Sequence, residues 1–307
     1  MALTGALAVS NPVAAGGAAA RAWSRLVPQV DRRFPSLAVR VTTAPGDAER
    51  WALEWAAAHP GRPVIAVGGD GTVHEVLNGL LRGHPSASLG IIPAGTGNDV
   101  ARNTGVPINP EGALERIFRN RPTAVDAARV RFQGTGAEPR TRLLLNSISV
   151  GVSPRANHIA GRIRRALPGR FRYAISGILA LAAEGAGEYT VTAGGRTLYH
   201  GRALNLTLAN GASFGGGMRI SPGSTVSDGM LDLVVIGAIG RIRALIALSR
   251  LYAGTHVQMG GVSVTAVGET VQIRRADGPM LIEADGEEFE ARAELSVEIL
   301  RGAVQLL

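Results

Sequence analysis

The sequence predicts a two-domain protein, in which a doubly wound α/β domain is followed by a mainly antiparallel β domain. Strand and helix patterns alternate regularly up to about residue 127, and short strand patterns separated by Gly- and Asn-rich turns follow it. With 307 residues, 46% of them hydrophobic, the chain is long enough to bury two cores.

The N-terminal elements follow from the spacing of apolar residues. From Val73 to Leu81 apolar side chains recur at i, i+3, i+4, i+7 and i+8, which predicts an amphipathic helix. Strands are expected at 7–10, 37–42, 64–67 and 89–92, and helices at 18–26, 47–58, 73–81 and from 99 onward. We expect Pro28 to end the first helix, because proline lacks the backbone N–H of a helix interior. Such alternation predicts βαβ units and a parallel sheet.

The second half is expected to be rich in strands. Strands are expected at 143–150, 189–191, 204–208, 231–236, 262–264, 271–273, 281–283 and 295–299, with helical insertions at 159–167 and 239–252. The first domain is assigned to residues 1–127 and the second to 128–295, with 296–307 expected to pack back on the first domain.

Composition limits the classes of partner. The formal charge of +8 favours an acidic partner, which could be a nucleic acid, a nucleotide or an anionic lipid. Aromatic residues make up only 4%, and the arginines do not interleave with stacking side chains, so we expect no nucleic-acid partner. The chain has no lysine, so a phosphate site here must use backbone N–H groups, arginine and metal.

Cysteine content and hydropathy bear on location. The chain has no cysteine, which excludes disulfides and thiolate metal sites and fits a reducing cytoplasm. The apolar stretches at 174–183 and 230–239 are too short, or too interrupted by glycine, to span a bilayer. We therefore expect a cytoplasmic protein that can sit peripherally on the inner face of the membrane.

Two glycine-rich loops follow neighbouring predicted strands. The first is GGDGT at 68–72, and the second is PAGTGND at 93–99. Glycine lets the backbone approach a ligand closely, and the N-terminus of the following helix favours phosphate. Ligands of doubly wound sheets bind at the carboxyl ends of strands, where both loops would lie. The alternative is that both are ordinary capped turns.

The polar residues of these loops predict their chemistry. Thr72 and Thr96 can donate hydrogen bonds to phosphate oxygens, whereas Asp70 and Asp99 would repel phosphate and are expected to act through Mg²⁺ or its waters. A third loop, NPVAAG at 11–16, follows the first strand at the same edge of the sheet.

The motifs together resemble those of the diacylglycerol kinase catalytic-domain family, specifically the bacterial diacylglycerol and lipid kinases. They are NPVAAGG, GGDGTVHEVLNGL, PAGTGNDVAR, NGASFGGGM, SDGMLDL and ADGEEF, in this order over nearly the whole chain. GGDGT also occurs in NAD kinases, and it is PAGTGNDVAR together with ADGEE that favours the lipid kinases. The resemblance implies an NAD kinase-like, Rossmann-like α/β domain that binds nucleotide, a lipid-substrate domain built as a β-sandwich, and ATP in the cleft between them.

The resemblance also implies site residues. The ATP contacts fall on Asn11, Pro12, Val13, Ala14, Ala15, Thr42, Gly69, Asp70, Gly71, Thr72, Val73, His74, Glu75, Thr96, Asn98 and Asp99. The catalytic carboxylate falls on Glu287, with Asp285 as the second candidate. A structural Mg²⁺ falls on Asp228, with backbone carbonyls at Thr225 and Met230.

The acidic turn at 285–287 suits this chemistry on physical grounds. A lipid hydroxyl has a very high pKa, so a positioned carboxylate that accepts its proton would assist phosphoryl transfer. Taken alone, the Asp-Gly-Glu-Glu sequence fits a solvated surface turn better, and only its occurrence together with the other motifs favours the catalytic role.

A basic segment, Arg155–Arg172, holds six arginines and no acidic residue. Ile159, Ile163 and Leu167 are spaced at i, i+4 and i+8, which is typical of an amphipathic helix on an anionic membrane surface. The apolar stripe could instead pack on the β domain or form a homodimer.

The sequence therefore predicts an ATP-dependent lipid kinase that uses Mg²⁺, with conversion of diacylglycerol to phosphatidic acid as the favoured reaction. The alternatives are another lipid alcohol of the phosphatidylglycerol or sphingoid type, an NAD kinase-like enzyme, and a non-catalytic regulator that binds lipid or nucleotide.

Overall fold

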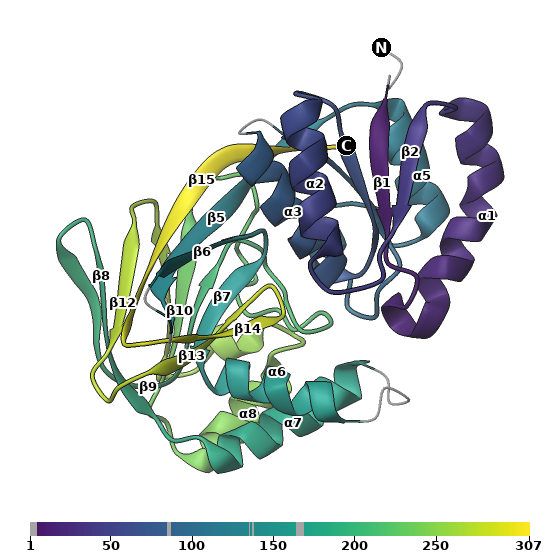
Figure 1. Ribbon diagram of the computed structural model, residues 1–307. Helices are drawn as coiled ribbons and strands as arrows, with labels where there is room; N and C mark the ends of the chain where they lie inside the picture. The colour runs from purple at the N-terminus through teal and green to yellow at the C-terminus, as the bar shows by residue number, and fades with distance from the viewer. Residues whose placement is uncertain (1–4, 85–86, 135, 137, 164–168) are drawn as a thin grey trace. The chain divides into compact units, whose positions relative to one another are not determined.

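The computed structural model describes residues 5–84, 87–134, 136, 138–163 and 169–307 (Figure 1). The chain forms two compact units. The first comprises the residues up to Ala127 together with Arg301–Leu307, and the second comprises Ala128–Leu300. The chain therefore passes from the first unit to the second and returns at its C-terminus.

The first unit alternates strands and helices, as predicted. Its elements are β1 (Ala6–Ser10), η1 (Ala14–Gly17), α1 (Ala18–Arg33), β2 (Leu37–Val41), α2 (Asp47–Ala58), β3 (Val64–Gly68), α3 (Asp70–Gly83), β4 (Ala87–Pro93), α4 (Asp99–Asn103) and α5 (Pro110–Arg119). Two long strands, β5 (Thr123–Gln133) and β15 (Glu294–Leu306), have residues in both units.

The sheet of the first unit is parallel, which confirms the predicted α/β architecture. Its strand order is β2-β1-β3-β4-β15, and each neighbouring pair runs parallel. Every residue of β1 and β3 is buried, as expected for strands covered on both faces. One face packs against α1 and α5 through a core that contains Leu26, Ile65 and Ile117.

Helix α1 continues past Pro28, so the predicted end of this helix is wrong. Leu26 and Val30, on either side of the proline, are both buried in the core of the first unit. An interior proline costs roughly 3 kcal/mol, whereas burying each of these side chains contributes about 1.5–3 kcal/mol. Packing on both sides therefore outweighs the broken hydrogen-bond ladder.

Helix α5 was not predicted, although its ends carry helix signals. The Oδ1 atom of Asn109 accepts the Gly112 N–H at 2.6 Å, and Pro110 occupies the first turn. Asn120 ends the helix in the left-handed conformation. These capping residues could have identified the helix.

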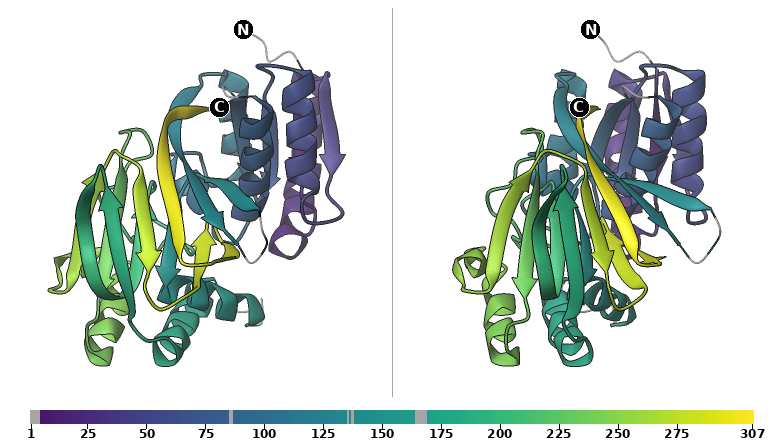
Figure 2. Two further views of the ribbon diagram at one scale, coloured as in Figure 1. Left: turned by 60° about the vertical axis from the view of Figure 1, so that its left-hand side comes forward. Right: turned by 90° about the vertical axis from the view of Figure 1, so that its left-hand side faces the viewer.

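The second unit is built mainly of antiparallel strands (Figure 2). Its elements, besides the shared β5 and β15, are β6 (Pro139–Leu144), β7 (Ser147–Gly151), α6 (Val152–Arg162), α7 (Gly169–Ala183), β8 (Gly187–Ala193), β9 (Arg196–Ala209), β10 (Leu231–Gly237), α8 (Arg241–Arg250), η2 (Thr255–Gln258), β11 (Val262–Val267), β12 (Val271–Arg275), β13 (Met280–Ala284) and β14 (Glu287–Ala291).

The strands of the second unit follow the order β14-β13-β7-β9-β8-β12-β15, with β10 and β11 continuing from β9. The register of these pairs is antiparallel throughout. Side chains on the inner face, among them Tyr189, Leu206, Ile282 and Val297, form one apolar core. The predicted antiparallel β domain is confirmed.

The strand predicted at 143–150 is two strands, β6 and β7, separated by Leu145 and Asn146. The backbone N–H groups of these two residues donate to the carboxylate of Asp285 instead of to a neighbouring strand. Asp285, which is distant in sequence, thus interrupts the hydrogen bonding between strands at these two residues.

The helix predicted at 159–167 has different bounds. Helix α6 begins at Val152 and ends at Arg162, and Ile163 is already extended, with ψ of 141°. Gly161 weakens the last turn, since glycine costs about 1 kcal/mol relative to alanine in a helix. Leu167, which completed the predicted stripe, lies outside the described residues.

Within the described residues, no helix is long and apolar enough to cross a membrane.

Candidate active site

The two glycine-rich loops of the first unit lie in backbone contact, which confirms that they come together. The Ala94 N–H donates to the Gly68 carbonyl oxygen at 2.7 Å. A Cβ atom on Gly95 would lie 2.4 Å from the Gly69 Cα. Since real Cβ contacts are never so short, only glycine permits this approach at position 95. The carboxyl ends of β3 and β4 thus form one continuous loop surface.

Asp70 ties the first loop to the second. Its Oδ1 atom accepts the backbone N–H of Val100, in the first turn of α4, at 3.0 Å. If Asp70 interacts with Mg²⁺ as predicted, its carboxylate does so while it also accepts the hydrogen bond from Val100. Asp99 is buried in the same region, with one oxygen 3.9 Å from the Nε atom of Arg102.

Asn98 gives the second loop its shape. Its backbone is left-handed, with φ of 54°, a conformation that asparagine adopts more readily than most residues. The Oδ1 atom accepts the Gly95 N–H at 2.9 Å, and the Nδ2 atom donates to the Gly95 carbonyl at 3.1 Å. The Asn98 side chain therefore supports the loop through two hydrogen bonds with the backbone of Gly95.

The loop after β1 joins the same edge of the sheet. The Asn11 N–H donates to the Val67 carbonyl at 3.0 Å, and the Asn11 side chain donates to Thr72 Oγ1 at 3.2 Å. Pro12, Ala14 and Ala15 are half-buried. All three predicted phosphate loops are therefore neighbours within the first unit.

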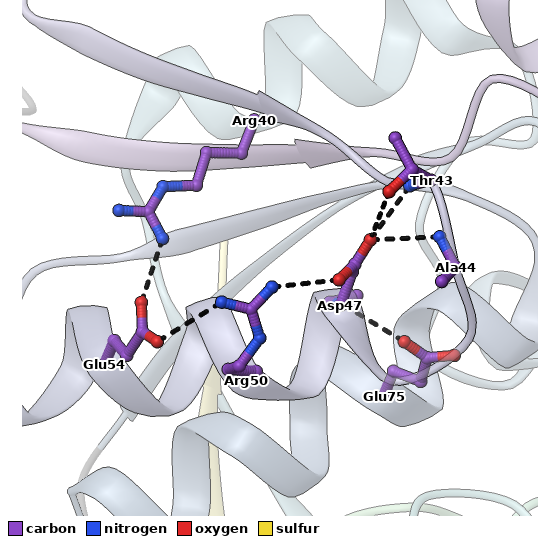
Figure 3. A network of polar contacts seen from close by, with 8 residues as sticks. Arg40, Thr43, Ala44, Asp47, Arg50, Glu54 and Glu75 are labelled. Carbon is purple, nitrogen blue, oxygen red and sulfur yellow. Dashed lines mark hydrogen bonds and ion pairs between the residues drawn. The ribbon is translucent and has the colours of Figure 1, made fainter.

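Thr42 and Glu75 are connected to this edge through the turn that precedes α2. The Thr42 N–H donates to Ser10 O at 2.9 Å. The Glu75 carboxylate accepts the Ala48 N–H at 3.2 Å, at the start of α2 (Figure 3). Glu75 thus caps a helix in the structure, besides being a predicted ATP contact.

Asp47 fixes that turn. Its carboxylate accepts the backbone N–H groups of Thr43 and Ala44, and Arg50 donates to it from the next helical turn (Figure 3). These backbone hydrogen bonds, with the Arg50 guanidinium, hold the pKa of the Asp47 carboxyl well below its usual range.

The remaining predicted ATP contacts differ in exposure. Val13, Gly71 and Thr96 are exposed, whereas the side chains of Val73 and His74 are buried. A ligand could therefore meet Val73 and His74 only through their backbone. The N-cap of α3 is Gly69, which has no side chain to cap the first turn that begins at Asp70.

The acidic turn lies in the second unit, between β13 and β14. Asp285 and Gly286 form a two-residue hairpin turn with φ of 48° and 91°, as a type I′ turn requires. The Asp285 carboxylate is buried and accepts the N–H groups of Leu145, Asn146 and Ser147 at 2.7, 2.9 and 3.0 Å. Asp285 therefore anchors the turn to the chain between β6 and β7.

Three further side chains hold the turn, and the sequence did not predict them. The Glu283 carboxylate accepts the Gly286 N–H at 2.6 Å. From α6, Asn157 Nδ2 donates to the Gly286 carbonyl at 3.0 Å and to Glu288 Oε1 at 3.1 Å. His158 Nδ1 lies 3.0 Å from Glu288 Oε2. Glu287, the first residue of β14, therefore follows a turn that is fixed on both sides.

The comparisons with known proteins agree with this geometry. The profile of the diacylglycerol kinase catalytic domain matches residues 5–130, and that of the YegS C-terminal NAD kinase beta sandwich-like domain matches residues 146–307. A "Probable lipid kinase YegS-like" protein of Stenotrophomonas maltophilia is 31% identical over 88% of this chain and 86% of its own length. The chain belongs to the family of YegS-like lipid kinases.

Another relative and a solved structure support the assignment of this lipid kinase to its family. A protein of Pseudomonas aeruginosa with the same description is 30% identical, over 88% of this chain and 84% of its own length. A crystal structure of "a putative diacylglycerol kinase from Bacillus anthracis" superposes with a TM-score of 0.77 at 25% identity, over 98% of this chain and 96% of that one.

The NAD kinases share the fold. The NAD kinase of Archaeoglobus fulgidus in complex with ATP has a TM-score of 0.53 at 14% identity, over 96% of this chain and 90% of that one. With the β-sandwich description of the C-terminal match, this confirms the predicted fold class, an NAD kinase-like α/β domain followed by a β-sandwich domain.

The segment predicted to hold a structural Mg²⁺ in the lipid kinase is a surface loop. Thr225 and Asp228 are exposed, and Asp228 Oδ1 accepts the Met230 N–H at 3.0 Å. Next to it, Asp232 accepts the hydroxyls of Ser221 and Ser224 at 2.7 and 2.5 Å. Among the described residues, no cluster of three or more His, Asp or Glu side chains could hold a metal. The predicted donors are one carboxylate and backbone carbonyls, which are oxygen ligands that suit a hard cation.

Proposed function

We propose that this lipid kinase transfers the γ-phosphoryl group of ATP to a hydroxyl group of a membrane lipid, and that diacylglycerol is the acceptor, which gives phosphatidic acid. The observation that carries the proposal is the contact between the two glycine loops at Gly69 and Gly95, next to the loop that begins at Asn11. Backbone N–H groups, helix N-termini and threonine hydroxyls gathered at one sheet edge suit a triphosphate.

The residues of the first unit would bind and orient the nucleotide. The α3 N-terminus and the hydroxyls of Thr72 and Thr96 would donate to phosphate oxygens, and Asn98 would keep the second loop in its bound shape. Mg²⁺, when bound with ATP, would neutralise charge on the phosphates. Any interaction of Asp70 with the ion or its waters would be made together with the hydrogen bond from the Val100 N–H to Oδ1.

In the second unit, Glu287 would accept the proton of the lipid hydroxyl. The carboxylate of Asp285 already accepts three backbone N–H groups, so we assign it to positioning the turn. Glu287 follows directly, half-buried at the start of β14, and is the carboxylate that we assign to proton transfer. Asp228, with the carbonyls of Thr225 and Met230, would hold a cation that stabilises its loop.

The test is a lipid-panel phosphorylation assay with purified protein, labelled ATP and magnesium. Diacylglycerol, phosphatidylglycerol and sphingosine are offered separately in mixed micelles, NAD is offered in a separate reaction, and products are identified by mass spectrometry. We expect phosphatidic acid from diacylglycerol. Phosphorylation of another lipid, with none of diacylglycerol, would refute diacylglycerol as the acceptor. Conversion of NAD to NADP with no lipid product would refute the whole proposal.

The assigned base is tested in the same assay. Glu287→Gln removes the proton acceptor and is expected to lower kcat by about 10²–10⁴-fold, while ATP affinity measured by calorimetry stays within about twofold. Glu290→Gln, on the same strand and exposed, is the matched control and should behave as wild type. An unchanged kcat in Glu287→Gln would exclude Glu287 as the base.

A further inference from the structure

Two helices of the second unit present large apolar side chains to solvent. On α7 these are Ile175, Ile178 and Leu179, and on α8 they are Ile242, Leu245 and Ile246, with exposed fractions between 42% and 76%. We refer to these six residues as the α7–α8 face. Scattered exposed apolar residues are normal, but contiguous groups of them mark interaction sites.

The six residues have the same spacing on both helices, i, i+3 and i+4, so each trio lies on one side of its helix. The opposite sides are buried and carry small residues, among them Ala180 on α7 and Ala244 and Ala247 on α8. Both helices therefore present large apolar residues outward, where a solvated surface helix carries polar ones.

The two helices form a single surface. A Cβ atom on Gly177 of α7 would lie 2.9 Å from Leu248 Cδ1 of α8, so the helices are in close contact. Tyr173 of α7 and Leu248 of α8 pack against the same core cluster, which contains Met218 and Ile220. The outward sides consequently point away from one shared core. Figures 1 and 2 show α7 and α8 together at one end of the second unit in every view.

The charged residues of α6, α7 and α8 have one sign. Arg241, Arg243 and Arg250 are exposed on α8, and Arg155 and Arg162 are exposed on the adjacent α6. Helices α6, α7 and α8 contain no acidic residue. An apolar centre with an arginine rim complements a surface of anionic headgroups over hydrocarbon.

We propose that the α7–α8 face docks on an anionic phospholipid bilayer, with its isoleucine and leucine side chains entering the interface and the surrounding arginines binding lipid phosphates. A second copy of this chain is the less suitable occupant, because two such faces would oppose arginines to arginines with no acidic residue on these helices. The proposal accords with a lipid acceptor but does not depend on catalysis. The surface includes α8, which lies outside the basic segment singled out in the sequence.

The test is vesicle co-sedimentation of the full chain without ATP. Wild-type protein is expected to sediment with vesicles of phosphatidylcholine mixed with phosphatidylglycerol, and to stay in solution with phosphatidylcholine alone. The double variant Ile178→Ser/Ile242→Ser should lower the partition coefficient on mixed vesicles by about tenfold or more, because two apolar side chains no longer enter the interface. Arg241→Gln/Arg250→Gln should weaken binding to anionic vesicles and reduce its salt dependence.

Ile108→Ser is the matched control, since Ile108 is an exposed isoleucine of the first unit. It should bind as wild type, and thermal unfolding should show that all variants are folded. The proposal is overturned if wild type fails to bind mixed vesicles or if Ile178→Ser/Ile242→Ser binds them unchanged. A double variant that turns a dimer into a monomer in analytical ultracentrifugation, with vesicle binding unaltered, would overturn it in favour of self-association. Kinase activity does not enter any of these readouts, so a failed phosphorylation assay would leave them interpretable.

Discussion

Two carboxylates two residues apart, Asp285 and Glu287, have different surroundings. The Asp285 side chain is buried and holds three backbone N–H groups of the chain between β6 and β7. Glu287 is half-buried at the start of β14. The sequence shows only the Asp-Gly-Glu order, and it is the three long-range hydrogen bonds that separate an anchoring residue from the proposed base.

The anchoring role of Asp285 predicts a large loss of stability on Asp285→Asn. An asparagine amide would turn its NH₂ group toward a backbone N–H, so at least one buried donor would lose its acceptor, at about 1–3 kcal/mol. Denaturant unfolding should show this loss, whereas Glu290→Gln, an exposed neutralisation nearby, should change little. Wild-type stability in Asp285→Asn would show that the three hydrogen bonds do not support the turn.

Asn157 is expected to position the acidic turn from α6. Asn157→Ala removes the hydrogen bonds to the Gly286 carbonyl and to Glu288 Oε1. We expect kcat to fall about tenfold while KM for ATP is unchanged, since a positioning defect affects the reacting groups more than nucleotide binding. Asn157→Gln, which keeps the amide, should restore part of the rate. Equal losses in kcat and in ATP affinity would contradict this assignment.

At the scale of elements, the sequence predicted the helices and loops whose structure depends on residues close together in the chain. Helix α2 has the predicted bounds, because its apolar spacing and its first-turn acidic residues act within the helix itself. The two glycine loops were also predicted, since a strand, a glycine turn and a helix follow one another directly. The continuation of α1 past Pro28 could not be predicted, because it depends on core contacts of Leu26 and Val30.

Much of the candidate site was beyond local patterns for the same reason. Asp285 meets Leu145 across 140 residues, and Asn157 meets Gly286 across 129. No spacing rule links such positions in a single sequence. The apolar segment of α7 was noticed only as too short to span a bilayer, and its outward face became apparent once α8 was seen to pack beside it.

The contact between the glycine loops predicts that Gly95→Ala is destructive. The added methyl group would lie 2.4 Å from Gly69 Cα, so the loops must separate. Overpacking of this kind costs about 1–3 kcal/mol, and ATP binding measured by calorimetry should be lost. Gly185→Ala is the control, since a Cβ there meets nothing within 4 Å. ATP binding retained in Gly95→Ala would show that the contact is not part of the nucleotide site.

At the scale of the whole molecule, His256 links stability to pH. It is fully buried, and its Nε2 lies 3.1 Å from the Ile220 carbonyl oxygen, which can only accept a hydrogen bond, so the Nε2–H group donates. Burial lowers the pKa of His256 below its usual value of 6.5. The unfolded chain therefore binds a proton that the folded chain does not, and stability that is present above pH 6.5 is lost as the pH falls toward the folded pKa.

His256→Gln should remove that dependence, because its amide can still donate to Ile220 but does not titrate. Below about pH 6.5 the free energy of unfolding of wild type should fall more steeply, by at most about 1.4 kcal/mol per pH unit. Denaturant unfolding at a series of pH values measures this. His200→Gln, at an exposed position of the same unit, should keep the wild-type slope. Identical slopes for wild type and His256→Gln would refute the linkage.

The return of the chain to its first unit makes the last residues necessary for that unit. Val304–Leu306 pair with Ala87–Leu89 of β4, and Leu306 and Leu307 are buried. A chain that ends at Leu300 would expose the edge of β4 and lose about 5 kcal/mol of apolar burial, a large fraction of the about 5–15 kcal/mol that stabilises a typical domain.

Hydrogen exchange resolves this effect by unit. The truncation should accelerate exchange of the amides of β4 and β3, and should abolish ATP binding. Amides of β12 and β8 should be unaffected, because the residues of β15 that pair with β12 end at Val297 and remain in the shortened chain. Slow exchange retained throughout β4 would show that the first unit folds without its returning strand. Loss of protection in β12 as well would show that the two units unfold together, because the truncation removes no backbone pairing of β12.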